Sequence, residues 1–194
     1  MPRQPDPDLE ERILKAAYAL WHRGGEKALT LRAVARAARS NTPAVYRRFK
    51  NRRELVRGLL GITVARIGKI FEAGATTEQM LEAYVDLALE QPREFELFYT
   101  HAREMAPPKR SGGPKPIRES RPNFARLEDT LAKRLGGSPE DHTRLALALW
   151  AMAHGTAVIL LSRAIEGHEA DLRSACRTAV KTMLDGAANF SEKK

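Results

Sequence analysis

Apolar residues recur every three or four positions along almost the whole chain. This spacing predicts amphipathic α-helices. Alternating β-branched stretches and Asn-Gly or Asp-Gly hairpin signals are absent from the sequence. We therefore expect an all-α protein of about nine helices. The predicted helices span residues 7–23, 31–38, 42–49, 52–71, 78–90, 92–105, 124–135, 139–165 and 168–188.

Glycines and short polar residues mark where these helices begin and end. Gly24-Gly25 is expected to stop the first helix, and Thr30, Asn41 and Asn51 are placed to cap the next three. The segment 106–122 contains five prolines, two glycines and five basic residues. It carries too little apolar material to pack, so we predict a loop there.

The longest apolar run, residues 145–161, is shorter than the roughly 20 residues that a membrane helix needs. It also contains His154 and Thr156, so we predict a fully buried helix and no membrane association. The N-terminus lacks the apolar core of a secretory signal. The single cysteine, Cys176, excludes an internal disulfide framework and suggests a small buried residue in a reducing compartment. These features favour a cytoplasmic protein.

Charge is distributed unevenly between the two parts of the chain. Residues 1–75 contain 16 Lys/Arg against 7 Asp/Glu, whereas residues 76–194 contain 17 of each. The whole net charge of +9 therefore lies in the first two fifths of the sequence. This asymmetry suggests that residues 1–75 bind a polyanion and that residues 76–194 have a different function.

The basic part contains the pattern TLRAVARAARSNTPAVYRRF, residues 30–49, followed by KNRREL. A helix-turn-helix needs small residues where its two helices cross, and Ala35 and Ala38 meet that need. The second helix begins with short side chains that can approach base edges in the major groove. Donors suited to phosphates surround it. The donors are Arg32, Tyr46, Arg47, Arg48, Lys50, Arg52 and Arg53.

Residues 10–60 resemble the DNA-binding domain of the TetR family. The resemblance rests on the Tyr46-Arg47-Arg48-Phe49 element and on the exit cap Lys50-Asn51-Arg52. The family usually has Gly-Val in the turn, where this chain has Arg39-Ser40. A side chain must therefore adopt the turn conformation that glycine normally permits. By resemblance, the residues facing bases would be Arg32, Thr42, Pro43, Ala44 and Arg47, and those binding phosphates would be Tyr46, Arg48, Lys50 and Arg52.

The C-terminal part resembles a TetR-family regulatory domain of the subgroup marked by Trp-x-x-x-His-Gly, here Trp150, His154 and Gly155. The resemblance implies a homodimer through the last two long helices. It also implies a site for a small apolar effector. The candidate ligand-binding residues are Tyr84, Phe98, Met105, Trp150 and His154, with Phe95 and Tyr99 on the same helix as Phe98. Each of them could equally be plain core, and Gly155 could simply permit close helix approach.

The favoured hypothesis is a sequence-specific repressor that binds double-stranded DNA at a near-palindromic operator and is released by its effector. Residues 1–55 would form the DNA-binding domain and residues 56–194 the effector-binding and dimerisation domain. A basic architectural protein without an effector is the first alternative, but it does not explain the neutral C-terminal part. A helical enzyme is the second. The five histidines are scattered and no metal or phosphate-binding motif is present, so we expect no catalytic residue, metal or cofactor.

Overall fold

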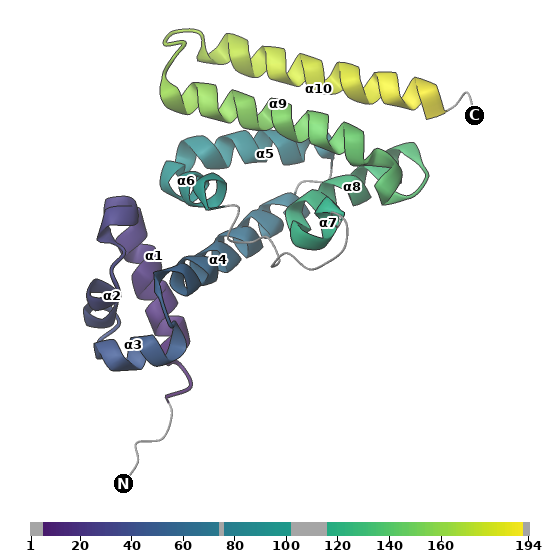
Figure 1. Cartoon of the computed structure of the whole chain (residues 1–194). Coiled ribbons are helices and arrows are strands. Elements are labelled where there is room, and N and C mark those ends of the chain that lie inside the picture. The colour runs from purple at the N-terminus through teal and green to yellow at the C-terminus, as the bar shows by residue number, and fades with distance from the viewer. Residues whose placement is uncertain (1–5, 74–75, 102–115, 192–194) are drawn as a thin grey trace. The chain divides into compact units, whose positions relative to one another are not determined.

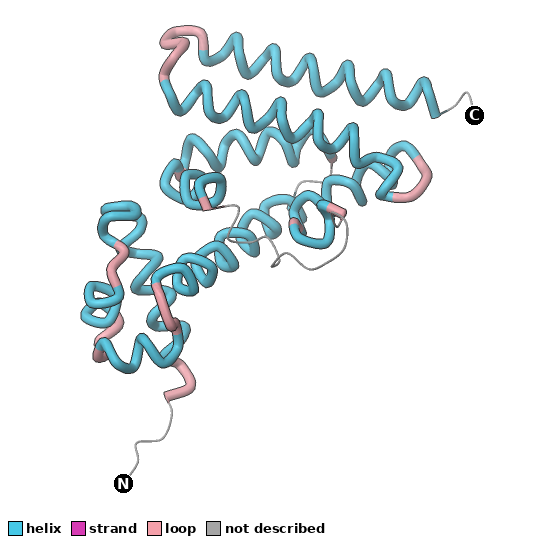
Figure 2. Tube along the Cα trace, viewed as in Figure 1, coloured by secondary structure: helices cyan, strands magenta, loops and turns pink. Residues whose placement is uncertain are grey.

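The computed structural model describes residues 6–73, 76–101 and 116–191. Within those ranges the regular structure is entirely helical, which confirms the all-α prediction (Figures 1 and 2). The first six helices are α1 (Leu9–Ala28), α2 (Leu31–Ala37), α3 (Thr42–Arg48), α4 (Arg52–Ala73), α5 (Thr77–Glu90) and α6 (Pro92–Thr100). The remaining elements are α7 (Ile117–Ser120), α8 (Pro122–Leu135), the 3₁₀ turn η2 (Pro139–His142), α9 (Thr143–Ser162) and α10 (Glu169–Ser191).

The described residues form two compact units, the first of which contains residues 6–63 and 96–101. In this unit α1, α2, α3 and the first half of α4 enclose a core in which Ile13, Trp21, Val34 and Leu55 are at most 2% exposed. Burying such apolar side chains supplies most of the stability of a small helical unit. The core thereby fixes the relative orientation of α1, α2 and α3.

The first helix is broken at the predicted glycine stop, and a further helical turn follows the break. α1 continues to Ala28, with Gly25 in a non-helical conformation at φ 59° inside it. Glycine tolerates this positive φ because it has no Cβ. Gly25 therefore interrupts the helix, and the chain makes a further turn before Leu29, which is fully buried. The prediction that Gly24-Gly25 stops the first helix is therefore confirmed.

The second unit contains residues 64–95 and 116–191. Here α9 packs against α5 and α10, and α8 packs against α7, η2 and α9 (Figure 1). The α9 region is long and apolar enough to cross a membrane by length and composition alone, with a mean hydropathy of 1.8 over its best window. Only a third of that window is buried, and Val158 and Ile159 are 40% and 39% exposed. The prediction of a fully buried helix was therefore wrong for α9, because one apolar face of this helix is exposed on the surface of the subunit.

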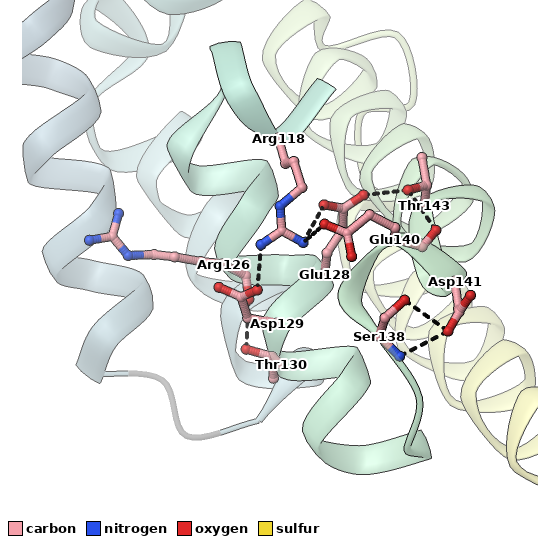
Figure 3. A network of polar contacts seen from close by, with 9 residues as sticks. All are labelled: Arg118, Arg126, Glu128, Asp129, Thr130, Ser138, Glu140, Asp141 and Thr143. Carbon is pink, nitrogen blue, oxygen red and sulfur yellow. Dashed lines mark hydrogen bonds and ion pairs between the residues drawn. The ribbon is translucent and has the colours of Figure 1, made fainter. Parts of the chain in front are cut away.

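A one-turn helix, α7, lies in the segment predicted as a loop. Of residues 106–122, residues 106–115 fall outside the described part of the chain, and residues 117–120 are helical. Arg118 holds this turn by ion pairs to Asp129 at 2.9 Å, Glu140 at 3.0 Å and Glu128 at 3.5 Å (Figure 3). Glu128 also accepts a hydrogen bond from Thr143 Oγ1 at 2.5 Å. The network ties α7 to α8 and to the start of α9, which corrects the loop prediction for this stretch.

Candidate functional site

Side-chain caps define the boundaries of α2, α3 and α4. Thr30 Oγ1 accepts a hydrogen bond from Ala33 N at 3.1 Å, and Asn41 Oδ1 accepts one from Ala44 N at 2.8 Å. At the start of α4, Asn51 Oδ1 accepts from Glu54 N at 3.0 Å. Each cap satisfies a backbone N–H that has no partner within its helix. All three caps lie where the sequence pattern predicted them.

The turn between α2 and α3 contains Arg39, for which the sequence pattern predicted a backbone conformation that glycine normally adopts. Arg39 adopts φ 52°, in the left-handed region that costs residues with a Cβ about 1–2 kcal/mol. Ser40 N donates to Ala35 O at 2.9 Å and Arg39 N donates to Arg36 O at 3.1 Å. These two bonds hold the turn, so α3 follows α2 with helix-turn-helix spacing.

The packing of α3 decides which of its side chains face outward. Val45 is fully buried and Ala44 is 6% exposed, whereas Tyr46 is 50% exposed. The expectation that Ala44 faces outward is therefore corrected, because its methyl group is part of the inner face of α3. Pro43 and Arg47 are exposed, and Thr42 is half-buried. The outward face thus carries Pro43, Tyr46 and Arg47.

The predicted phosphate-binding cations differ in how their side chains are engaged. Arg48 Nη2 donates to Asp6 O at 3.3 Å, and its Nη1 lies 4.0 Å from Glu10 Oε2. Arg52 donates to the carbonyl oxygens of Leu29 and Glu26, both at 3.2 Å, and forms a 2.9 Å ion pair with Glu26. Arg52 therefore binds the C-terminal end of α1. Its guanidinium serves the fold of this unit, and the phosphate contact expected of Arg52 stays a prediction.

A shallow hollow of about 400 Å³ lies beside the start of α3. Thr42 and Tyr46 form one wall of this hollow, and Arg32 and Leu31 at the start of α2 form another. Arg32 and Lys50 are exposed. The outward face of α3 therefore combines short side chains, a half-exposed tyrosine and nearby cations, a combination suited to a polyanion that offers both phosphates and base edges.

The second unit brings three of the five candidate ligand-binding residues together. Tyr84 Oη lies 3.0 Å from His154 Nδ1. The Trp150 ring centroid lies 6.3 Å from that of His154. Burial raises the pKa of Tyr84 to about 12 and lowers the pKa of His154. Both groups are therefore neutral at pH 7, and one hydrogen bond joins them in an apolar surrounding.

Three further side chains complete this aromatic cluster. Phe95 stacks on His154 with ring centroids 5.5 Å apart, and Phe124 meets Trp150 edge-on at 6.1 Å. The guanidinium of Arg121 lies 6.0 Å from the Trp150 ring centroid, a cation–π distance. The helical spacing already indicated Phe95, but nothing local signals Phe124 or Arg121, which come from α8 and the residue before it.

The other two candidate residues are placed differently. Phe98 is buried, 9% exposed, but belongs to the first unit, and Met105 lies outside the described residues. The part of these two residues in a ligand site stays a prediction. Within residues 6–73, 76–101 and 116–191, no group of three His, Cys, Asp or Glu side chains is arranged to hold a metal ion.

Comparison with known families decides the class of the protein. Residues 13–59 match the model described as "Bacterial regulatory proteins, tetR family", and residues 77–183 match "Tetracyclin repressor-like, C-terminal domain". The chain belongs to the TetR family. It is therefore a DNA-binding transcriptional regulator, with its helix-turn-helix in α2 and α3. No curated protein sequence matches this chain closely.

Solved structures share the fold of this TetR-family chain at low sequence identity. A TetR-family transcriptional regulator from Streptomyces coelicolor is 22% identical, with a TM-score of 0.63 over 92% of this chain and 99% of its own. A TetR variant from Acinetobacter baumannii AYE, in complex with minocycline, is 16% identical, with a TM-score of 0.61 over 97% and 99%. The multidrug binding protein EbrR, complexed with imidazole, is 19% identical, with a TM-score of 0.62 over 94% and 93%.

Proposed function

We propose that this regulator is a repressor whose homodimer inserts two copies of α3 into successive major grooves of a near-palindromic operator. A small apolar effector would bind the second unit and lower the affinity for DNA. The observation that carries the proposal is the outward face of α3, with Tyr46 half-exposed between caps and cations. Two symmetric recognition helices match the spacing of operator half-sites.

We divide the DNA contacts by the chemistry of the side chains. Arg32, Thr42, Pro43 and Arg47 would contact base edges, and Tyr46, Arg48 and Lys50 would contact phosphates. Ala44 and Arg52 are left out of this surface, because one is buried and the other binds the end of α1. We assign DNA binding to residues 1–55, and effector binding and dimerisation to residues 56–194.

Dimerisation would use the outer faces of α9 and α10. Val158 and Ile159 are exposed there, and a Cβ built at Gly155 or at Gly186 would meet nothing within 4 Å in its own chain. Small residues on an apolar helix face allow the backbone of a second helix to approach closely. A four-helix interface between two subunits would cover these side chains.

The effector site would be the aromatic cluster of Tyr84, Trp150 and His154. Its Trp150-x-x-x-His154-Gly155 element supports placing the chain in the Trp-x-x-x-His-Gly subgroup. The minocycline and imidazole complexes of the related structures support a small-molecule ligand. Phe98, which belongs to the first unit, and Met105, which lies outside the described residues, stay candidates from the sequence alone. A protein of this kind acts on DNA in the cytoplasm.

Selection of operators from random duplexes, followed by fluorescence anisotropy at several salt concentrations, tests the DNA contacts. Tyr46→Phe should weaken binding to all selected duplexes evenly, whereas Thr42→Ala should change the preference at a few base positions. Tyr99→Phe is a matched control, because Tyr99 is 47% exposed in the same unit but lies outside α2 and α3. Equal losses for the Tyr46 and Thr42 variants on every sequence would contradict this division of roles.

Sedimentation equilibrium tests the proposed dimer. Gly155→Leu should weaken self-association at least tenfold, because its side chain would fill space that the partner helix needs. Gly61→Leu is the control, since a Cβ at that helical glycine also meets nothing within 4 Å of its own chain but lies on α4. If both variants remain dimeric, the interface lies elsewhere.

A further inference from the structure

A pocket of about 260 Å³ opens in the second unit between α5 and α10. Its floor is almost entirely apolar and comes from three helices. The floor residues are Leu81 and Val85 of α5, Thr156 of α9, and Cys176 and Val180 of α10. None of Tyr84, Trp150 or His154 lines it. We propose that this pocket is a second small-molecule site, which takes a small carboxylate with a one-ring apolar body.

Two charged edges flank the apolar floor. The α5 edge carries Glu78 and Glu82, and the α10 edge carries Arg173, Arg177, Lys181 and Asp185. Arg134 of α8 also lines the pocket and pairs with Glu78 and Asp185. Residues four apart lie on the same face of a helix, so each edge is a continuous stripe. The α5 edge is therefore acidic, and three of the four charged residues of the α10 edge are basic.

The basic edge retains cations that can receive a ligand. Arg173 is paired with Asp86 across the helices. Arg177 Nε, in contrast, lies 3.9 Å from Glu82 Oε1, close to the outer limit of an ion pair. Lys181 forms no ion pair with any residue in the described part of the chain. One turn of α10 thus presents two cations, while the nearby carboxylates of Glu78 and Asp185 are paired with Arg134 at 2.6 Å and 3.7 Å. A ligand carboxylate placed between the two cations gains two charge-assisted contacts.

The size and lining of the pocket restrict the rest of the ligand. Drug-sized molecules occupy sites of roughly 300–1,000 Å³, so a pocket of about 260 Å³ takes something smaller. The floor side chains offer no charge to a ligand body, which favours a ring or a branched alkyl group. An arylalkanoate such as 3-phenylpropanoate fits both requirements.

The pocket lies on the other side of α10 from the proposed dimer interface. Cys176 and Val180 face the core, and Arg177 and Lys181 lie to one side of them. The helical repeat of 100° per residue places Gly186 on the opposite side. The site would therefore stay open in the dimer, and its occupancy does not depend on the proposed function of the aromatic cluster.

Methyl NMR of the full-length protein, labelled at Leu and Val, tests the site with three matched probes: 3-phenylpropanoate, 3-phenylpropan-1-ol and 3-phenylpropylamine. We expect saturable shifts of the Leu81, Val85 and Val180 methyls with the carboxylate, with a dissociation constant on the order of 1 mM for so small a ligand. The alcohol should bind about 2- to 5-fold more weakly, because it lacks the contacts to partly exposed cations. The amine should bind more weakly still.

Lys181→Met keeps most of the aliphatic stem and removes the charge. It should weaken binding of the carboxylate about 2- to 5-fold and leave binding of the alcohol unchanged. Lys69→Met, an exposed change on α4 away from the pocket, should alter neither. Equal affinity for the three probes, shifts confined to methyls outside the pocket, or an unaltered Lys181 variant would each overturn the proposal.

Discussion

Replacing Arg39 by glycine should stabilise the first unit. Arg39 has φ 52° in the turn between α2 and α3, where a residue with a Cβ pays about 1–2 kcal/mol. Glycine avoids that cost but loses roughly 0.5–1 kcal/mol more backbone entropy on folding. The difference leaves a gain of about 0.5–1 kcal/mol for Arg39→Gly. Arg39→Ala is the matched control, because it removes the same charge and keeps the Cβ.

Urea denaturation can report this gain separately for the first unit. The chain has two tryptophans, of which Trp21 lies in the core of the first unit and Trp150 in the second. In a Trp150→Phe background, fluorescence follows Trp21 alone. The glycine variant should unfold at a higher urea concentration than the alanine variant, with the same dependence on denaturant. If the alanine variant is equally stable or more stable, the turn is not strained and the reasoning fails.

Four further changes test the contacts around the helix-turn-helix and the buried acid of α6. Asn41→Ala should cost about 1 kcal/mol of unfolding free energy, because it removes the cap of a seven-residue helix. Arg52→Met should lower stability but leave the salt dependence of DNA binding unchanged, whereas Arg48→Met should reduce the slope of log affinity against log salt by about 1. Burial raises the pKa of Glu94 from 4.5 to about 7, against the effect of Arg66, which donates to Glu94 Oε1 and favours the ionised carboxylate. The folded protein then binds the extra proton, so stability falls as pH rises through this window. Glu94→Gln should remove that loss, which denaturation at pH 4.5, 6 and 8 would show.

Local sequence signals were sufficient for most helix boundaries. Thr30, Asn41 and Asn51 each have a side chain that caps the helix after it, and this chemistry depends only on residues within one turn. The same holds for the left-handed turn at Arg39, which follows from the place of that residue in the motif. Local chemistry of this kind can be read without knowing the tertiary contacts.

The predictions failed or were incomplete where distant contacts decide the outcome. α7 forms because Arg118 meets carboxylates on α8 and η2, and no pattern within residues 106–122 indicates these partners. Arg52 donates to carbonyl oxygens of Glu26 and Leu29, more than twenty positions away. Ala44 is different, since its burial beside Val45 follows from the orientation of α3 against α2, which composition cannot show.

The open space beside Gly155 and Gly186 affects how variants of this protein should be screened. Because added side chains at these positions meet nothing in their own subunit, an isolated subunit has no steric reason to unfold when they are enlarged. Thermal melts of dilute protein would then show little change in melting temperature for such variants. Such variants would instead need a higher protein concentration to occupy an operator. Mutational surveys of this chain should therefore vary protein concentration as well as temperature.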